Sequence, residues 1–323
     1  MCPRPPALTI AKQAAFLCAL LGIVGDQDLS AQSEHVSFID AAGLYRDACS
    51  ACHGPLGNGQ GKGARLLGET QPRDFTAGVF KFRTTPTGSL PTDEDLFRTI
   101  SRGVPGTWMP EWEGLLSEDQ RWALIRYIKG FSEFFSFEEP DPPVRIPPER
   151  EVSLQVISEG HMVYVALKCA QCHGPLGLGD GPSADELTDD WDRKIRPYDF
   201  TRGGYRSGAT PSDIYRTLAT GLSGTPMPAF EQGIVLFPGG SEVEIGSMSE
   251  GLDRETVNSL RTYLDGQPTR AQIDALSPAE ARTLAENRRW ALVHYVRSLG
   301  RPKSLLFRLF GEKPELSTGR GGR

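Results

Sequence analysis

The sequence lacks any long run of hydrophobic residues, and this absence limits what the chain can be. A membrane-spanning helix needs about 20 consecutive, mostly apolar residues, whereas the longest apolar stretch covers only residues 14–24. An excess of positive charge is also missing, because 35 basic side chains are set against 41 acidic ones for a formal net charge of −6. Proteins that bind nucleic acids usually carry basic patches, so we expect no nucleic-acid partner.

Residues 1–31 have the features of an export signal. Positive side chains precede the apolar residues 14–24, and small residues suited to cleavage follow, ending at Ala31. We therefore expect a signal peptide that is cleaved near Ala31 and a mature protein in the periplasm. An uncleaved anchor or a buried helix is the alternative. Cleavage would remove Cys2 and Cys18, which leaves four of the six cysteines.

The chain contains an internal repeat. The segment that begins at Cys49 aligns with the segment that begins at Cys169, and four further blocks follow in the same order in both halves. Five matching blocks in one order indicate a tandem duplication of a unit of about 100 residues. The other blocks begin at Asp74 and Asp199, Asp95 and Asp213, Gly106 and Gly224, and Trp122 and Trp290.

The repeat divides the chain into domains. A proline-rich linker at 138–150 has the composition of a semi-rigid spacer, so we expect a first domain over 32–137 and a second over 151–300. The second copy is 50 residues longer than the first between its second methionine and its last helix, which places an insertion within about 231–285. A basic and apolar tail follows at 301–323.

The predicted fold class is all-α. No segment of any length alternates apolar and polar side chains as a half-buried strand does. Capping patterns for helix starts recur instead, and the insertion holds one predicted helix at about 253–264. The long Gly- and Pro-rich loops between helices would need a large apolar group to pack against. The predicted helix caps are Thr92, Ser117, Thr210 and Ser277.

Each copy carries one Cys-x-x-Cys-His motif, which is typical of covalent attachment of c-type haem. On one helical turn the motif presents two thiols to the porphyrin vinyl groups and an imidazole to the iron. We therefore expect two covalently bound haem c groups with histidine as proximal ligand. A thioredoxin-like pair would need a βαβ context and a zinc site a second ligand pair, and the sequence has neither. The motif residues are Cys49, Cys52 and His53, and Cys169, Cys172 and His173.

Methionine is the predicted sixth ligand of each iron. Met109 and Met227 fall at equivalent places in the repeat, each in a Gly-rich loop and each followed by proline. A thioether opposite imidazole raises the reduction potential, although methionine often only fills gaps in a core. Met162 and Met248 have no counterparts, and we assign them to packing. Surface or packing roles are also predicted for His35, His161 and His294.

Three further features concern the surroundings of the haem groups. Arg83 and Arg206 lie in similar contexts and are candidates to neutralise haem propionates, with plain surface charge as the alternative. Trp108 beside the first axial methionine is replaced by Pro226 in the second copy, so the two haem environments are expected to differ. The glycines that follow each motif are predicted to let the chain pass close to the porphyrin.

With these motifs the sequence resembles a dihaem, class I-like cytochrome c, and its copies look most like the cytochrome domains of the cbb3 oxidase subunit III type. The resemblance rests on CSACHGPLGNGQG with GTWMP and on CAQCHGPLGLGDG with GTPMP. It covers about 36–135 and 153–300, apart from the insertion. It implies two tandem cytochrome c-like domains with long haem-packing loops, haem attachment through the four motif cysteines, and the same axial pairs.

The expected function is the transfer of single electrons, without catalysis. Two six-coordinate irons leave no position for a substrate, and no nucleophile–base set stands out. The donor would be a periplasmic dehydrogenase or a quinol-oxidising complex, and the acceptor a further cytochrome or a terminal reductase, docked through charge. The alternatives are a dihaem enzyme, either peroxidase-like or thiosulfate-oxidising, and the cytochrome subunit of a larger oxidoreductase complex, docked through 301–323 at a partner or a membrane surface.

Overall fold

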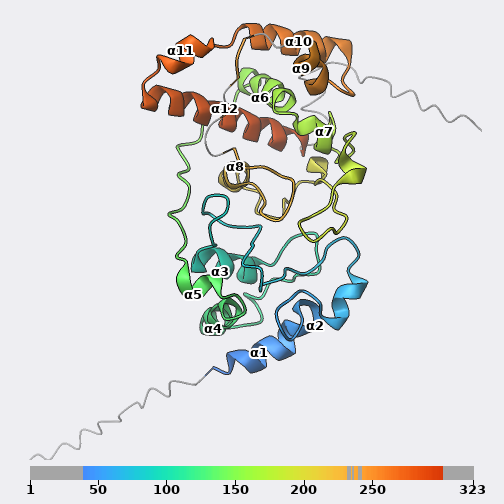
Figure 1. Cartoon of the computed structure of the whole chain (residues 1–323), viewed down its shortest axis with the longest axis vertical. Coiled ribbons are helices and arrows are strands. Elements are labelled where there is room, and N and C mark those ends of the chain that lie inside the picture. The colour runs from blue at the N-terminus through green and yellow to red at the C-terminus, as the bar shows by residue number, and fades with distance from the viewer. Residues whose placement is uncertain (1–38, 231–233, 235, 239–241, 301–323) are drawn as a thin grey trace, which may run out of the picture. The chain divides into compact units, whose positions relative to one another are not determined.

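A computed structural model describes residues 39–230, 234, 236–238 and 242–300 (Figure 1). In this part of the chain every regular element is a helix, and strand-like pairing is limited to one isolated bridge between Thr188 and Lys194. The all-α prediction is therefore confirmed. The predicted signal peptide, His35 and the tail lie outside the described residues. Among those that are described, no helix combines the length and the apolar character that a bilayer crossing requires.

The first repeat closes its core by packing its first helix against its last long one. Helix α1 lies on α4, and α3 packs on α4 from another side. Tyr45, Leu124 and Ile125 are almost fully buried between them. The elements of this repeat are α1 (Ala41–Ala48), α2 (Ser50–His53), η1 (Lys62–Leu66), α3 (Asp93–Arg102), α4 (Glu118–Lys129) and α5 (Phe134–Phe137).

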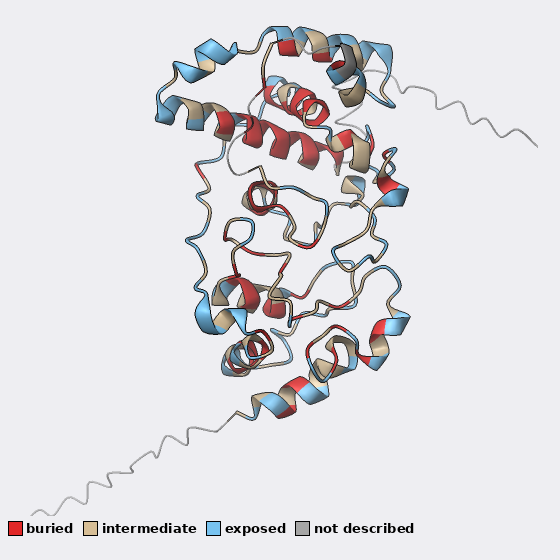
Figure 2. Cartoon of the chain, in the orientation of Figure 1, coloured by how far each residue is buried: buried red, intermediate tan, exposed pale blue. Residues whose placement is uncertain are grey.

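The second repeat has the same plan with longer helices. Helix α6 packs along α12, and both are buried where they meet (Figure 2). A Cβ at Gly160 of α6 would overlap the carbonyl of Ala291 in α12, so the two backbones approach as closely as they do only because residue 160 is glycine. The elements are α6 (Leu154–Ala166), α7 (Cys169–His173), η2 (Ala184–Glu186), η3 (Phe200–Arg202), α8 (Pro211–Thr220) and α12 (Pro278–Leu299).

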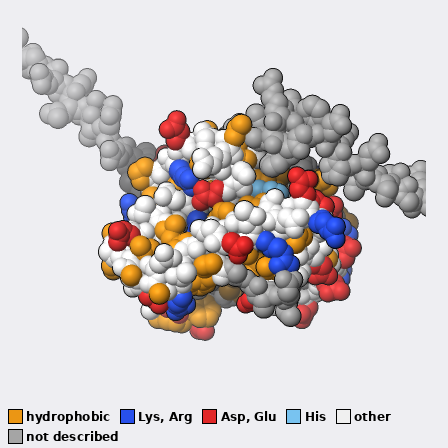
Figure 3. Space-filling view, turned by 90° about the horizontal axis from the view of Figure 1, so that it is seen from above, with side chains coloured by type: hydrophobic (Ala, Val, Ile, Leu, Met, Phe, Trp, Pro, Cys, Tyr) orange, Lys and Arg blue, Asp and Glu red, His pale blue; other side chains and the backbone are white. Residues whose placement is uncertain are grey.

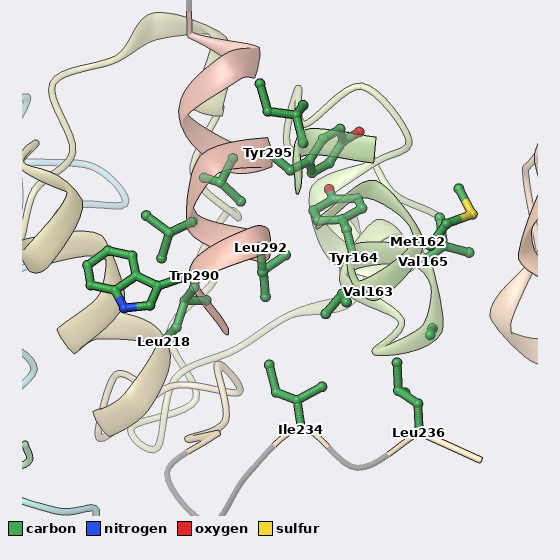
Figure 4. Close-up of a cluster of buried hydrophobic side chains, with 14 of the residues drawn as sticks. Met162, Val163, Tyr164, Val165, Leu218, Ile234, Leu236, Trp290, Leu292 and Tyr295 are labelled. Atoms are coloured by element: carbon green, nitrogen blue, oxygen red, sulfur yellow. The ribbon is translucent and has the colours of Figure 1, made fainter. Parts of the chain in front are cut away.

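Aromatic and aliphatic side chains fill the core of the second repeat (Figure 4). Tyr164 of α6 and Tyr295 of α12 meet edge to face with their ring centroids 5.2 Å apart. Ile234 and Leu236, which follow the second methionine loop, are buried in the same cluster. Ile234 and Leu236 therefore help to complete this core.

The described residues of the insertion include the helices α9 (Glu242–Met248), α10 (Arg254–Asp265) and α11 (Arg270–Asp274). Helix α10 lies where a helix was predicted at about 253–264, and it packs on α6. Arg288 of α12 links the insertion to the second core. It donates to the carbonyl of Ile234 at 2.7 Å and to the side chain of Gln267 at 2.5 Å. Seen from the side of these helices, acidic and basic side chains are interspersed, as on an ordinary solvated surface (Figure 3).

The predicted helix starts are confirmed by their hydrogen bonds. At each one the capping hydroxyl accepts the backbone N–H three residues on, and the side chain at that third position accepts the N–H of the capping residue. Both halves of a capping box are thus formed at every predicted cap. The four caps are Thr92, Ser117, Thr210 and Ser277.

The proline-rich segment at 138–150 is attached along its length. The N–H of Val144 donates to the carbonyl of Thr84 in the first repeat at 2.8 Å. Arg145 pairs with Glu286 of α12 at 2.7 Å, and Val144 packs against the core of the second repeat. The segment therefore adds contacts to both repeats in addition to connecting them.

Candidate haem sites

Each attachment motif occupies one short helix. In the first repeat Cys49 caps α2, which ends at His53, and in the second repeat α7 begins at Cys169. Residues three apart on a helix lie on the same face, so the two thiols of each motif are neighbours. All four thiols are free of disulfides and half-buried. This arrangement fits two thioether bonds to one porphyrin.

Both motif histidines are held in a defined tautomer. Nδ1 of His53 lies 3.1 Å from the carbonyl oxygen of Arg73, and Nδ1 of His173 lies 3.1 Å from that of Tyr198. A carbonyl only accepts, so Nδ1 carries the proton and Nε2 the lone pair. Burial lowers the pKa of both histidines, which favours the neutral imidazole that binds iron. Among the described residues, Nε2 of neither ring has a hydrogen-bond partner, so the residues present fit a haem iron at that atom.

A phenylalanine fixes the plane of each imidazole. Phe75 stacks on His53 with centroids 4.5 Å apart, and Phe200 stacks on His173 at 4.3 Å. The N–H of each phenylalanine donates to a glycine carbonyl of the loop after the motif at 2.7 Å. The sequence marked this position, because Asp-Phe-Thr is one of the repeated blocks, but it did not indicate that the ring stacks on the ligand.

A tyrosine holds the turn that follows each motif, and sequence reasoning missed it. The hydroxyl of Tyr45 donates to the carbonyl of Gly54 at 2.7 Å, and that of Tyr164 donates to Gly174 at 2.6 Å. The two tyrosines stand four and five residues before the first motif cysteine, which hides their equivalence. The extra residue is accommodated at Lys168, whose φ of 60° breaks the helix before α7.

Two of the glycines after the motifs lie against the attachment helices. A Cβ at Gly61 would overlap the carbonyl of Ala51, and a Cβ at Gly181 would overlap that of Gln171. Both carbonyls belong to the attachment helices. Gly61 and Gly181 therefore let the loop cross the chain's own attachment helix. The close approach of these loops to the porphyrin stays a prediction.

The two methionine loops have the same hydrogen bonds. In each loop the N–H five residues before the methionine donates to the methionine carbonyl, at 3.0 Å for Met109 and 3.2 Å for Met227. The methionine N–H donates to a threonine hydroxyl two residues earlier, Thr107 or Thr225, at 3.1 Å and 3.3 Å. The loops thus present the methionines alike, while the bonds from sulfur to iron stay predictions.

The residues assigned to packing are found in packing roles. Met162 is buried, and Met248 packs against the same core. His161 stacks on Tyr295 at 4.9 Å, and burial lowers its pKa to about 4. Nε2 of His294 lies 2.8 Å from the carbonyl of Arg150. No group of three or more His, Cys, Asp or Glu side chains in the described part of the chain is arranged to hold a metal ion.

The two candidate propionate arginines differ in their surroundings. Arg83 is 2% exposed and donates to the carbonyl of Thr220 in the second repeat at 2.9 Å, so it links the repeats. Arg206 lies over the ring of Tyr198, 6.0 Å from its centroid. Their contacts with haem propionates stay a prediction.

Comparison with protein families identifies the class. The model of the family described as cytochrome c oxidase, cbb3-type, subunit III matches residues 38–128, and that of cytochrome c matches 157–267. The chain belongs to the cytochrome c family and contains two tandem cytochrome c domains. Covalently bound haem c is implied at both motifs, which confirms the cofactor prediction.

The chain is similar to curated proteins and to a solved structure. Cytochrome c55X of Pseudomonas aeruginosa is 32% identical over 128 residues, which are 38% of this chain and 86% of the relative. Cytochrome c55X of Paracoccus denitrificans is 32% identical over 123 residues, 37% of this chain and 96% of the relative. A solved chain from the Kuenenia stuttgartiensis reducing HAO-like protein complex is 37% identical, with a TM-score of 0.63 over 81% of this chain and 96% of that one.

Proposed function

We propose that this dihaem cytochrome c transfers single electrons between protein partners in the periplasm, with His53 and Met109 ligating one iron and His173 and Met227 the other. The observation that carries the proposal is the repetition of the whole site: imidazole tautomer, stacked phenylalanine, tyrosine bond and methionine loop recur in both domains. Haem c, when bound, supplies a one-electron ferric–ferrous couple.

The chain's own residues suit this couple. The backbone carbonyls and stacked rings hold each imidazole in one orientation, so little rearrangement is needed when the charge of the site changes. Burial around His53 and His173 disfavours added positive charge, which favours the reduced state. Both effects serve a carrier that must accept and release electrons quickly.

The structural neighbour suggests the kind of partner. That chain is part of an HAO-like protein complex, and we propose that this chain likewise exchanges electrons with a larger oxidoreductase, either as a subunit or as a transient partner. A catalytic dihaem protein is the second candidate function, favoured by the same neighbour. It would require one iron without a methionine ligand.

The test is optical and uses the full chain matured with haem. The alkaline pyridine spectrum gives haem per chain, and the weak far-red band of the oxidised protein reports Met–Fe(III) ligation. We expect two haem groups, and a band that falls in both Met109→Ala and Met227→Ala but stays unchanged in Met162→Leu, a buried methionine outside the sites. A band that responds to only one axial substitution would contradict the proposal and favour the catalytic candidate.

The proposed location rests on residues 1–31. We expect the protein in the periplasmic fraction, with an N-terminus close to residue 32 when it is sequenced chemically. A protein that stays in the cytoplasmic fraction with its first residues intact would contradict it.

A further inference from the structure

One side chain of the first domain reaches the methionine loop of the second. Arg73 accepts the Nδ1 hydrogen bond of His53 through its backbone carbonyl at 3.1 Å. Its guanidinium lies over the ring of Trp191 in the second domain, 4.7 Å from the ring centroid. A cation over a tryptophan face is attracted by the electron-rich ring, and the attraction strengthens when water is excluded. Burial at this place lowers the pKa of Arg73 to about 10.

Trp191 is itself tied to the second methionine loop. The carboxylate of Asp189 accepts the N–H of Trp191 at 3.0 Å, and the N–H of Asp190 donates to the carbonyl of Gly224 at 3.2 Å. Gly224 stands three residues before Met227. The turn around Trp191 thus lies directly against the loop that presents the sixth ligand.

The packing at Gly224 is tight, and the described residues around Gly106 show no equivalent. A Cβ at Gly224 would lie 2.8 Å from a ring carbon of Trp191 and 3.1 Å from Nη1 of Arg73. Gly106, the equivalent residue before Met109, would meet nothing within 4 Å. Only the second methionine loop is therefore supported from outside by the Arg73–Trp191 pair.

We propose that Arg73 is a positioning residue for Met227, so that a side chain of the first domain holds the sixth ligand of the second haem. The inference rests on the proposed ligation of iron by Met227. Because the carbonyl of the same residue orients His53, a displacement of Arg73 acts on both centres. The equivalent residue of the second domain, Tyr198, does not reciprocate through its hydroxyl, which donates within its own domain to Gly203 at 2.6 Å.

The first arm of the test changes Arg73 and reads the second haem. In the Met109→Ala background the far-red band reports Met227 alone. We expect Arg73→Gln to weaken this band, to lower the reduction potential of the second haem, and to let imidazole displace Met227 at about a tenth of the concentration needed by the parent. Arg73→Lys, which keeps a cation near the Trp191 ring, should restore part of the loss. Arg193→Gln is the comparison: Arg193 lies over the same ring but farther away, at 5.8 Å, so we expect a smaller loss than in Arg73→Gln.

The second arm leaves Arg73 intact and uses the two glycines. Gly224 and Gly106 have nearly the same φ, +78° and +71°, so alanine adds the same backbone strain at both. Only at Gly224 does the new methyl group meet Trp191 and Arg73. We expect Gly224→Ala to weaken the Met227 band in the Met109→Ala background clearly more than Gly106→Ala weakens the Met109 band in the Met227→Ala background.

The outcomes separate the inference from the function on which it rests. An Arg73→Gln protein with the parent's band, potential and imidazole titration would overturn the inference, as would equal losses in the two glycine variants. Absence of any Met227 band in the Met109→Ala parent would instead overturn the proposed ligation.

Discussion

At the scale of single residues, each haem site is built from backbone carbonyls as much as from side chains. One carbonyl fixes the tautomer of the proximal histidine, and another receives a buried tyrosine hydroxyl that holds the turn after the motif. These bonds recur in both domains although the residues that supply the histidine-bound carbonyl, Arg73 and Tyr198, are unrelated in chemistry. The site therefore constrains the path of the main chain more strongly than the side chain at those positions.

Loss of the tyrosine bond should destabilise the second domain. In Tyr164→Phe the buried carbonyl of Gly174 loses its partner, which costs on the order of 1–3 kcal/mol. Denaturant unfolding of the haem-loaded protein measures this cost. Tyr127→Phe is the matched control, because Tyr127 packs in the first core without a hydroxyl hydrogen bond among the described residues. Equal stabilities of the two variants would refute the assignment.

The residues whose role could be predicted are those in a short motif of neighbouring positions. Cys49, Cys52 and His53 predict haem attachment because the motif must fit one helical turn. The contact of Arg73 with Trp191 has no such signature, since it joins distant parts of the sequence through an interface that forms only in the folded chain.

At the scale of secondary structure, neighbouring residues were enough to predict where helices begin, but not how distant segments pack together. The helix start at Thr210 was predictable because its hydroxyl and the carboxylate of Asp213 cap each other within four residues. The prolines of 138–150 predicted a semi-rigid spacer, but they gave no sign that Val144 would be held against the first domain and the second core. The position of this segment depends on the surfaces of the two domains, which cannot be inferred from the sequence of the segment alone.

The crossing of α6 and α12 offers a sharp test at this scale. Gly160→Ala adds a methyl group where the carbonyl of Ala291 lies, so the helices must separate, and we expect a loss of about 1–3 kcal/mol or more. Gly246→Ala in α9 meets nothing within 4 Å, and should be neutral or slightly stabilising. Thermal unfolding of both variants gives the comparison, and a Gly160→Ala protein as stable as the parent would show that the crossing tolerates a larger residue.

At the scale of the whole molecule, the described residues from Ile39 onward belong to one compact unit although they hold two haem domains. Hydrogen bonds from Arg83 and Thr87 to the carbonyl of Thr220 join the domains directly. The proline-rich segment adds a second connection. The two haem groups are therefore expected to keep a fixed separation during function.

Resistance to proteolysis measures how firmly the proline-rich segment is held. Arg145 and Arg150 are sites for trypsin, but both pair with carboxylates of the second domain, at 2.7 Å and 2.8 Å. We expect the haem-loaded protein to resist cleavage there, and Val144→Asp, which places a charge against the second core, to be cut rapidly at 145. Rapid cleavage of the parent at this position would show that the segment is a loose tether.

The pairing of α6 with α12 also sets an order of events during biosynthesis. A chain that emerges N-terminus first has every described helix of its first core once Phe137 has appeared, whereas α6 waits for residues 278–299 before its apolar face is covered. Contacts so far apart in sequence form late, because a long loop must close first. We therefore expect the second Cys-x-x-Cys-His segment to stay accessible to haem attachment for longer than the first.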